Sequence, residues 1–343
     1  MALIAIRVVR LRLHGTFMNT SFRWCAAGVG IAGLALASNI RAQCAGTVQK
    51  LYDERRFDEA RAEAEPQAKH KDSDAKSAYC VGRIAVAQDR SNEAVDWFEK
   101  AVDRDVNVAL YHLWLGNALG EEAQKASKFR QPFLARRVKT EFEAAVRLDP
   151  ASVDARHGLI QFYSQAPGIM GGSTDKAREQ VNEIAKLNRM RGHLELAALL
   201  ERDKDIVNAE REYQAAITAA PDSNAGYNGL INFSARQHKW DQVFATIEQH
   251  MKAKPDERSA KLAYGRAAAL SGQNLERGEQ EIKSWLASPP DDVQPAALSL
   301  VHTRLGAIYE RQGKADSART AYQEAVRLNS KNIEAKHALE QLK

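Results

Sequence analysis

Small and large apolar residues recur in a fixed order along residues 44–343. The order is Leu-Gly-x-x-Tyr followed by Ala-x-x-x-Phe-x-x-Ala, and the last copy fills it with Leu305, Gly306, Tyr309, Ala318, Tyr322 and Ala325. Further copies start at Val81-Gly82, Leu115-Gly116 and Leu196-Ala197, followed in turn by Phe98, Phe142 and Tyr213. Alanine is spread evenly and aromatic residues make up only 7% of the chain, which favours helices over sheets. Self-similarity at a fixed period is the signature of a repeat architecture.

Aligning the copies on these anchors gives units that start near 41, 75, 109, 153, 190, 224, 258 and 299, and four of the seven intervals are 34 residues. The pattern resembles the tetratricopeptide repeat (TPR), whose unit is a pair of antiparallel helices. The resemblance implies an all-α fold, a right-handed superhelical solenoid of about eight helix-turn-helix units over residues 43–330. Residues 331–343 are expected to form a C-terminal capping helix. The chain is also similar to exported bacterial TPR proteins of unassigned function.

The anchors of each unit have a physical reason. A Gly or Ala beside the Leu, and the two Ala of the second helix, are expected where helices cross closely, because only small side chains allow that approach. Larger side chains then fill the space between helices, namely Phe98, Phe142, Tyr213 and Tyr322. Second helices are expected to end before Pro150, Pro221 and Pro255.

Two segments depart from the repeat. The third unit carries ten extra residues around 121–133, which stay compatible with a helix until Pro132, so we expect a lengthened helical hairpin that projects from the solenoid. The fourth unit has residues 166–176 where a tight turn should lie. Its Pro167-Gly168 and Gly171-Gly172 pairs, followed by Ser173 and Thr174, predict an ordered loop that ends at a helix cap.

The first 42 residues have the form of a targeting segment. They hold five arginines and no acid, and Trp24–Ala37 are fourteen uncharged residues, too few to span a membrane but suited to a signal-peptide core. We place cleavage after Ala42, which predicts a periplasmic or secreted protein; the alternative is an uncleaved N-terminal anchor. Met18 offers a second possible start. Without this segment the chain has 44 basic and 44 acidic residues, so net charge gives no reason to expect nucleic-acid binding.

The motifs of enzyme chemistry are missing from residues 43–343. The sequence holds no H-E-x-x-H, G-x-S-x-G, C-x-x-C or phosphate-binding P-loop there, so we predict no enzyme and no cofactor. His112, His193 and His302 occupy one slot of successive first helices, where core packing is a better interpretation than a metal site. Residues 171–174 could hold an anion at a helix start, but they lack the P-loop Lys, and a structural turn is favoured.

Two cysteines remain after cleavage. Cys44 and Cys80 lie in the first helices of the first two units. In an oxidising compartment such a pair closes if its Cα atoms come within roughly 4.4–6.8 Å. A disulfide and two buried apolar cysteines are equally compatible with the sequence.

The candidate binding surface is the concave face of the stacked first helices, which TPR solenoids expose as an extended groove. The residue after the Leu-Gly pair is polar in five of seven units, and neighbouring positions extend the same face. The candidates are Arg83, Asn117, His157, Gln161, Asn228, Asn232, Arg236 and Arg266. Amides and guanidinium groups suit the backbone and carboxylates of an extended peptide, so the leading hypothesis is a non-enzymatic scaffold in the cell envelope that binds a protein or peptide partner. The alternatives are a structural assembly component that acts through its convex face, and a ligand carrier or enzyme using residues 166–176.

Overall fold

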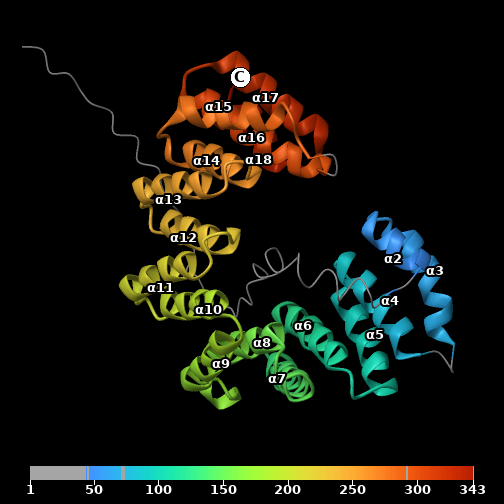
Figure 1. Ribbon diagram of the computed structural model, residues 1–343. Helices are drawn as coiled ribbons and strands as arrows, with labels where there is room; N and C mark the ends of the chain where they lie inside the picture. The colour runs from blue at the N-terminus through green and yellow to red at the C-terminus, as the bar shows by residue number, and fades with distance from the viewer. Residues whose placement is uncertain (1–43, 45, 71–73, 291–292, 343) are drawn as a thin grey trace, which may run out of the picture. The chain divides into compact units, whose positions relative to one another are not determined.

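The computed structural model describes residues 44, 46–70, 74–290 and 293–342. Every regular element in these ranges is a helix (Figure 1). The chain divides into two compact units, one up to Ala177 and one from Arg178, and each is described by itself. The expected leader at 1–42 lies outside the described residues.

The first unit is a run of helices in which each one from α2 to α8 packs against the next. Its elements are α2 (Gly46–Asp53), α3 (Phe57–Lys69), α4 (Ala75–Ala87), α5 (Ser91–Arg104), α6 (Ala109–Lys125), α7 (Gln131–Leu148), α8 (Val153–Gln165), the short 3-10 helix η2 (Gly168–Met170) and the start of α9 (Thr174–Leu187). Its core is rich in alanine and aromatic side chains, among them the fully buried Tyr79, Phe98 and Phe162.

The second unit is built in the same way, with each helix from α11 to α18 packed on the one before it. Its elements after α9 are α10 (Arg189–Arg202), α11 (Ile206–Ala219), α12 (Asn224–Arg236), α13 (Trp240–Ala253), α14 (Arg258–Ser271), α15 (Leu275–Leu286), α16 (Pro295–Arg311), α17 (Ala315–Leu328) and α18 (Ile333–Gln341). The all-helical prediction is confirmed. The last helix, α18, lies where the cap was expected.

The predicted period marks the first helix of most pairs. Helices α4, α6, α8, α12 and α14 begin at 75, 109, 153, 224 and 258, the expected starts. Helix α16 instead begins at Pro295, ahead of the expected 299. A proline fits the first turn of a helix because the N–H it lacks has no partner there. Second helices α7, α11 and α13 end at Leu148, Ala219 and Ala253, just before the prolines that were expected to stop them.

Glycines in the first helices lie against large side chains of the second helices, as predicted. A Cβ atom on Gly82 would lie 2.6 Å from the ring of Phe98, and one on Gly306 would lie 2.6 Å from the ring of Tyr322. Gly116 makes the same close approach to Phe142. The two helices of a pair can therefore approach this closely only because the glycine has no side chain.

Most pairs use one kind of tight turn, which the sequence pattern does not reveal. Arg55, Asp89, Lys204, His238 and Gly313 all have positive φ at the end of a first helix. The Lys204 N–H donates to the Glu201 carbonyl and the next N–H, of Asp205, donates to the Leu200 carbonyl at 2.9 Å. This is the Schellman arrangement, which satisfies the last carbonyls of a helix.

The two departures from the repeat replace that turn. Helices α6 and α7 are lengthened to 17 and 18 residues, as expected for the extended hairpin. The expectation that the first of them continues toward Pro132 is wrong: α6 ends at Lys125, and Pro132 lies in the first turn of α7. The 166–173 loop is ordered, since the Ser173 N–H donates to the Tyr163 carbonyl at 2.8 Å.

Candidate functional site

The residue after the small anchor of each first helix points away from the second helix. The glycine anchor faces its partner helix, and the next residue is rotated by about 100° around the helix axis. Asn117 and Arg266 follow such a glycine and are exposed; Gln161 and Asn232 hold the equivalent repeat position after Ile160 and Ile231, and both are half-buried. The first helices of neighbouring pairs also contact one another, α6 with α8 in the first unit and α14 with α16 in the second. Within each unit, this slot therefore lies on one face of adjacent first helices.

In the second unit the first helices carry an unpaired guanidinium on α14 and two amides on α12. Arg266 forms no ion pair or side-chain hydrogen bond with the part of the chain that the structure describes. Asn228 and Asn232 lie one turn apart on α12, and both are half-buried. Exposed or half-exposed donors of this kind can bind backbone carbonyls or carboxylates of a ligand.

Arg236, one turn further along α12, is committed to a contact within the protein. Its Nε and Nη2 donate to the two carboxylate oxygens of Glu201 on α10 at 2.7 and 2.8 Å. The Tyr213 hydroxyl donates to the same carboxylate at 3.1 Å. The hydrogen bond to Glu201 raises the pKa of Arg236, so the guanidinium stays charged. Arg236 therefore links two first helices and is not a free ligand.

Arg83 was predicted on the exposed face but is 5% exposed. Its guanidinium lies over the ring of Tyr52, 4.4 Å from the centroid, and near the rings of Tyr79 and Trp114. Helix α2 covers this end of α4, so the slot that is open elsewhere is closed here. An arginine can be buried in such a place because the faces of aromatic rings attract its charge. Arg83 is therefore a packing residue.

The remaining candidates of the first unit are half-buried. His157 and Gln161 lie one turn apart on α8. The Gln165 side-chain amide donates to Gln161 Oε1. Part of the hydrogen-bonding capacity of Gln161 is thus used within α8.

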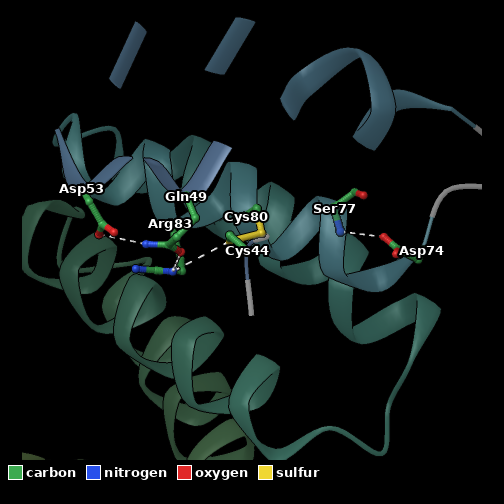
Figure 2. The surroundings of a disulfide bond; sticks show 7 residues. All are labelled: Cys44, Gln49, Asp53, Asp74, Ser77, Cys80 and Arg83. Carbon is green, nitrogen blue, oxygen red and sulfur yellow. Dashed lines mark hydrogen bonds between the residues drawn. A yellow bond between two sulfur atoms is a disulfide. The ribbon is translucent and has the colours of Figure 1, made fainter. Parts of the chain in front are cut away.

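Cys44 and Cys80 form a disulfide with Cα atoms 5.8 Å apart (Figure 2). The bond joins Cys44, two residues ahead of α2, to Cys80 of α4. Figure 2 shows Arg83 and Gln49 beside it, and Arg83 Nη1 lies 3.8 Å from Cys44 Sγ. The weakly covered N-terminal pair is therefore tied covalently to its neighbour.

The three histidines of the shared slot face glutamates of the second helices. His112 Nδ1 lies 2.6 Å from Glu141, and His193 Nδ1 lies 2.7 Å from Glu212. His302 lies near Glu324. His112 is buried, whereas His193 is half-buried. Within the described ranges no group of His, Cys, Asp and Glu side chains could hold a metal ion.

Residues 299–332, which cover most of α16 and all of α17, match the family model described as the tetratricopeptide repeat. The same glycine-to-aromatic seam occurs in other pairs of the chain. Residues 299–332 are therefore similar to a tetratricopeptide repeat, and the described helical pairs elsewhere in the chain pack in the same way. No curated protein sequence matches it significantly.

Several solved structures are similar to this chain. One is a tetratricopeptide repeat protein from Parabacteroides merdae, with 11% identity and a TM-score of 0.46 over 78% of this chain and 98% of that chain. Another is in the Cut9–Hcn1 complex of APC/C, with 15% identity and a TM-score of 0.43 over 90% of this chain and 58% of that chain. A third is YrrB, titled a TPR protein with an unusual peptide-binding site, with 12% identity and a TM-score of 0.35 over 71% of this chain and 97% of that chain.

Proposed function

We propose that this protein is a scaffold that binds an extended polypeptide segment along the exposed face of its first helices. The observation that carries the proposal is in the second unit, where the exposed Arg266 on α14 has no partner within the described residues and α12 carries the half-buried amides of Asn228 and Asn232. A solvated arginine on a helix surface destabilises the free protein little. When a ligand binds, its guanidinium can form charge-assisted hydrogen bonds with a carboxylate or carbonyl.

The binding partner is a protein or peptide, and the ligand groups are its backbone and its acidic side chains. Asn232 can exchange two hydrogen bonds with a peptide unit, and Arg266 can bind a carboxylate with two parallel bonds. Arg236 and Arg83 are excluded from direct contact because their guanidinium groups are engaged within the protein.

A photo-crosslinking amino acid at Asn232 or Arg266 tests this site in cells. It should capture a partner segment that mass spectrometry can map, and Asn232→Ala combined with Arg266→Ala should lower recovery of that partner about tenfold or more. The matched control is Arg327→Ala, which removes an exposed arginine of the second helix α17 that pairs with Glu324. Equal recovery from the double variant and the control would move the binding site to another face.

We further propose that the scaffold is exported, with its mature chain starting at Gln43. The arginine-rich start and the uncharged core of residues 1–42 support this, and a disulfide at Cys44 suits an oxidising compartment. Within the described ranges no helix has the length and apolar character needed to cross a bilayer. Purified cellular protein should begin at Gln43 and show no free thiol when unfolded without reductant; a protein that begins at Met1 or Met18 would contradict export.

A further inference from the structure

The lengthened hairpin of α6 and α7 ends in an ordered tip, which we define as residues 126–133. The Arg130 N–H donates to the Ser127 carbonyl at 2.9 Å, which closes the turn. The Arg130 guanidinium donates to the buried carboxylate of Glu122 at 2.7 Å, and the Gln131 amide donates to the Ala126 carbonyl. These bonds hold the tip in a defined conformation, so the same side chains are exposed in every folded molecule.

Two phenylalanines are exposed at this tip. Phe129 is 96% exposed and Phe133 is 65% exposed, although Phe is among the residues most often buried in proteins. The neighbours of Phe133 along α7, Leu134 and Ala135, are buried in the unit, so the core takes one face of the helix and leaves Phe133 outside. Exposed apolar side chains at an ordered turn indicate a surface that is covered by something else.

The same segment is strongly basic. Residues 125–139 hold six basic residues and no acid, although residues 43–343 as a whole carry as many acids as bases. We call residues 125–139 the basic segment; its charged members are Lys125, Lys128, Arg130, Arg136, Arg137 and Lys139.

Some of these side chains form ion pairs within the protein, and others are free to bind a ligand. Arg137 pairs with Glu99, Lys125 with Asp89 at 3.0 Å, Lys139 with Glu143 at 3.6 Å and Arg130 with Glu122 at 2.7 Å. Lys128 and Arg136 are exposed and form no ion pair with the residues that the structure describes. They flank the two phenylalanines along the chain, so apolar and cationic groups are presented together.

We propose that the hairpin tip binds the surface of an anionic bilayer, with Phe129 and Phe133 inserted at the level of the lipid headgroups and with Lys128 and Arg136 on lipid phosphates. Aromatic side chains suit this interfacial depth, and cations next to them are attracted by anionic lipids. A bilayer accepts a convex tip of any shape, whereas a protein partner needs a matching pocket for each ring. The association is peripheral and involves no membrane span.

The cationic side chains should also make binding selective for anionic lipids. The attraction by phosphates falls off within a Debye length and weakens with salt, while insertion of the rings does not depend on salt. Binding should therefore need both anionic lipid and the phenylalanines. It does not depend on Asn232 and Arg266 of the proposed peptide surface, which lie on α12 and α14.

Cosedimentation with vesicles tests the proposal with the chain from Gln43 to Lys343. Vesicles of equal parts phosphatidylglycerol and phosphatidylcholine should bind the protein, and vesicles of phosphatidylcholine alone should bind it at least about tenfold less. Phe129→Ser with Phe133→Ser, and separately Lys128→Gln with Arg136→Gln, should each lower binding to the anionic vesicles about tenfold. The matched control is Val207→Ser with Ile333→Ser, which removes two apolar side chains that are 72% and 80% exposed in the second unit and should leave binding unchanged.

A second readout separates insertion from simple charge attraction. Phe129→Trp should keep vesicle binding, and lipids brominated near the headgroup should quench its fluorescence more than that of the unchanged protein. No binding to anionic vesicles, or equal loss in the control variant, would overturn the proposal. Binding without quenching of the new Trp would also overturn it, because it would mean that the basic segment attaches by charge alone, as it would to an acidic protein.

Discussion

The absence of a side chain at Gly306 sets how closely α16 approaches α17. A Cβ atom there would lie 2.6 Å from a ring atom of Tyr322, closer than non-bonded carbons approach each other. Tyr322 is 2% exposed, and its hydroxyl donates to Glu310 at 2.9 Å, so the ring has little room to move.

Gly306→Ala should therefore destabilise the protein by about 1–3 kcal/mol in urea unfolding, in spite of the better helix propensity of alanine. The matched control is Gly168→Ala on the 166–173 loop, where no atom lies within 4 Å of the added Cβ. A stability of Gly306→Ala equal to that of the unchanged protein would show that the two helices separate without cost.

His250 makes the stability of the second unit sensitive to mild acid. The ring is fully buried, stacks on Tyr227 at 4.4 Å, and contacts Asn224 through Nε2 at 3.2 Å. Burial lowers the pKa of His250, with Glu257 acting against the shift and Lys254 adding to it. Burial also lowers the pKa of His302 on α16.

A histidine with a lowered pKa resists protonation in the folded state, while the unfolded chain takes up the proton below about pH 6.5. Stability should therefore fall as pH drops from 7.5 to about 5.5. His250→Gln with His302→Gln should show a smaller loss over this range in urea titrations, and an unchanged pH dependence would contradict the assignment.

Glu257 acts in a lower pH range. Burial raises its pKa, but hydrogen bonds from Ser259, Asn224 and Lys254 outweigh burial and lower it to about 2. The stability that ionised Glu257 contributes is fully present above pH 4.5 and is lost as the pH falls from there toward about 2. The histidine effect can thus be measured before this carboxylate is protonated.

For single residues, the sequence predicts the contacts that recur in every repeat unit. It does not predict contacts with side chains that only one other helix supplies. The glycines and aromatics of the seam follow from the repeat, since each unit supplies both partners. Arg83 sits in the same slot as Asn117, yet it is buried because α2 brings Tyr52 over it. Arg236 is likewise taken up by Glu201 of the preceding pair. No periodic pattern encodes either contact.

The backbone conformation of the turn between paired helices cannot be predicted from the repeat pattern. Lys204 has φ of 63°, a left-handed conformation that costs an L residue about 1 kcal/mol relative to glycine. Its side chain is exposed. Gly313 fills the corresponding position after α16, with φ of 75°.

Lys204→Gly should therefore stabilise the protein by about 0.5–1 kcal/mol, because the turn loses its strain and keeps its two backbone hydrogen bonds. Lys204→Ala is the matched control: it also removes the charge and the long side chain but keeps the Cβ, so it should change the unfolding free energy little. Equal stability of the two variants would show that the left-handed turn carries no strain here.

Element lengths were predictable where one residue type decides them. The prolines after α7, α11 and α13 stop those helices as expected, because a proline cannot continue the hydrogen-bond ladder. The break between α6 and α7 was not predictable in the same way. Residues 121–131 contain no strong breaker, and the chain turns at Ser127 through backbone bonds and the contact of Arg130 with Glu122.

At the scale of the whole molecule, stability should be local. The extensive contacts between described helices join elements that are neighbours or next neighbours in the chain. In such a stack the free energy is close to a sum over pairs and their interfaces, so a defect lowers the stability of nearby pairs and leaves distant ones intact.

Two buried tryptophans of second helices test this locality in opposite directions. Trp97 on α5 and Trp285 on α15 are 4% and 5% exposed, and truncating a buried tryptophan to alanine costs about 3–5 kcal/mol. Trp285→Ala should raise amide hydrogen exchange in α14, α15 and α16 and leave protection in α4 and α5 unchanged. Trp97→Ala should do the reverse. A loss of protection in all helices from either variant would mean that the chain unfolds as one cooperative body, against the nearest-neighbour behaviour that the repeat predicts.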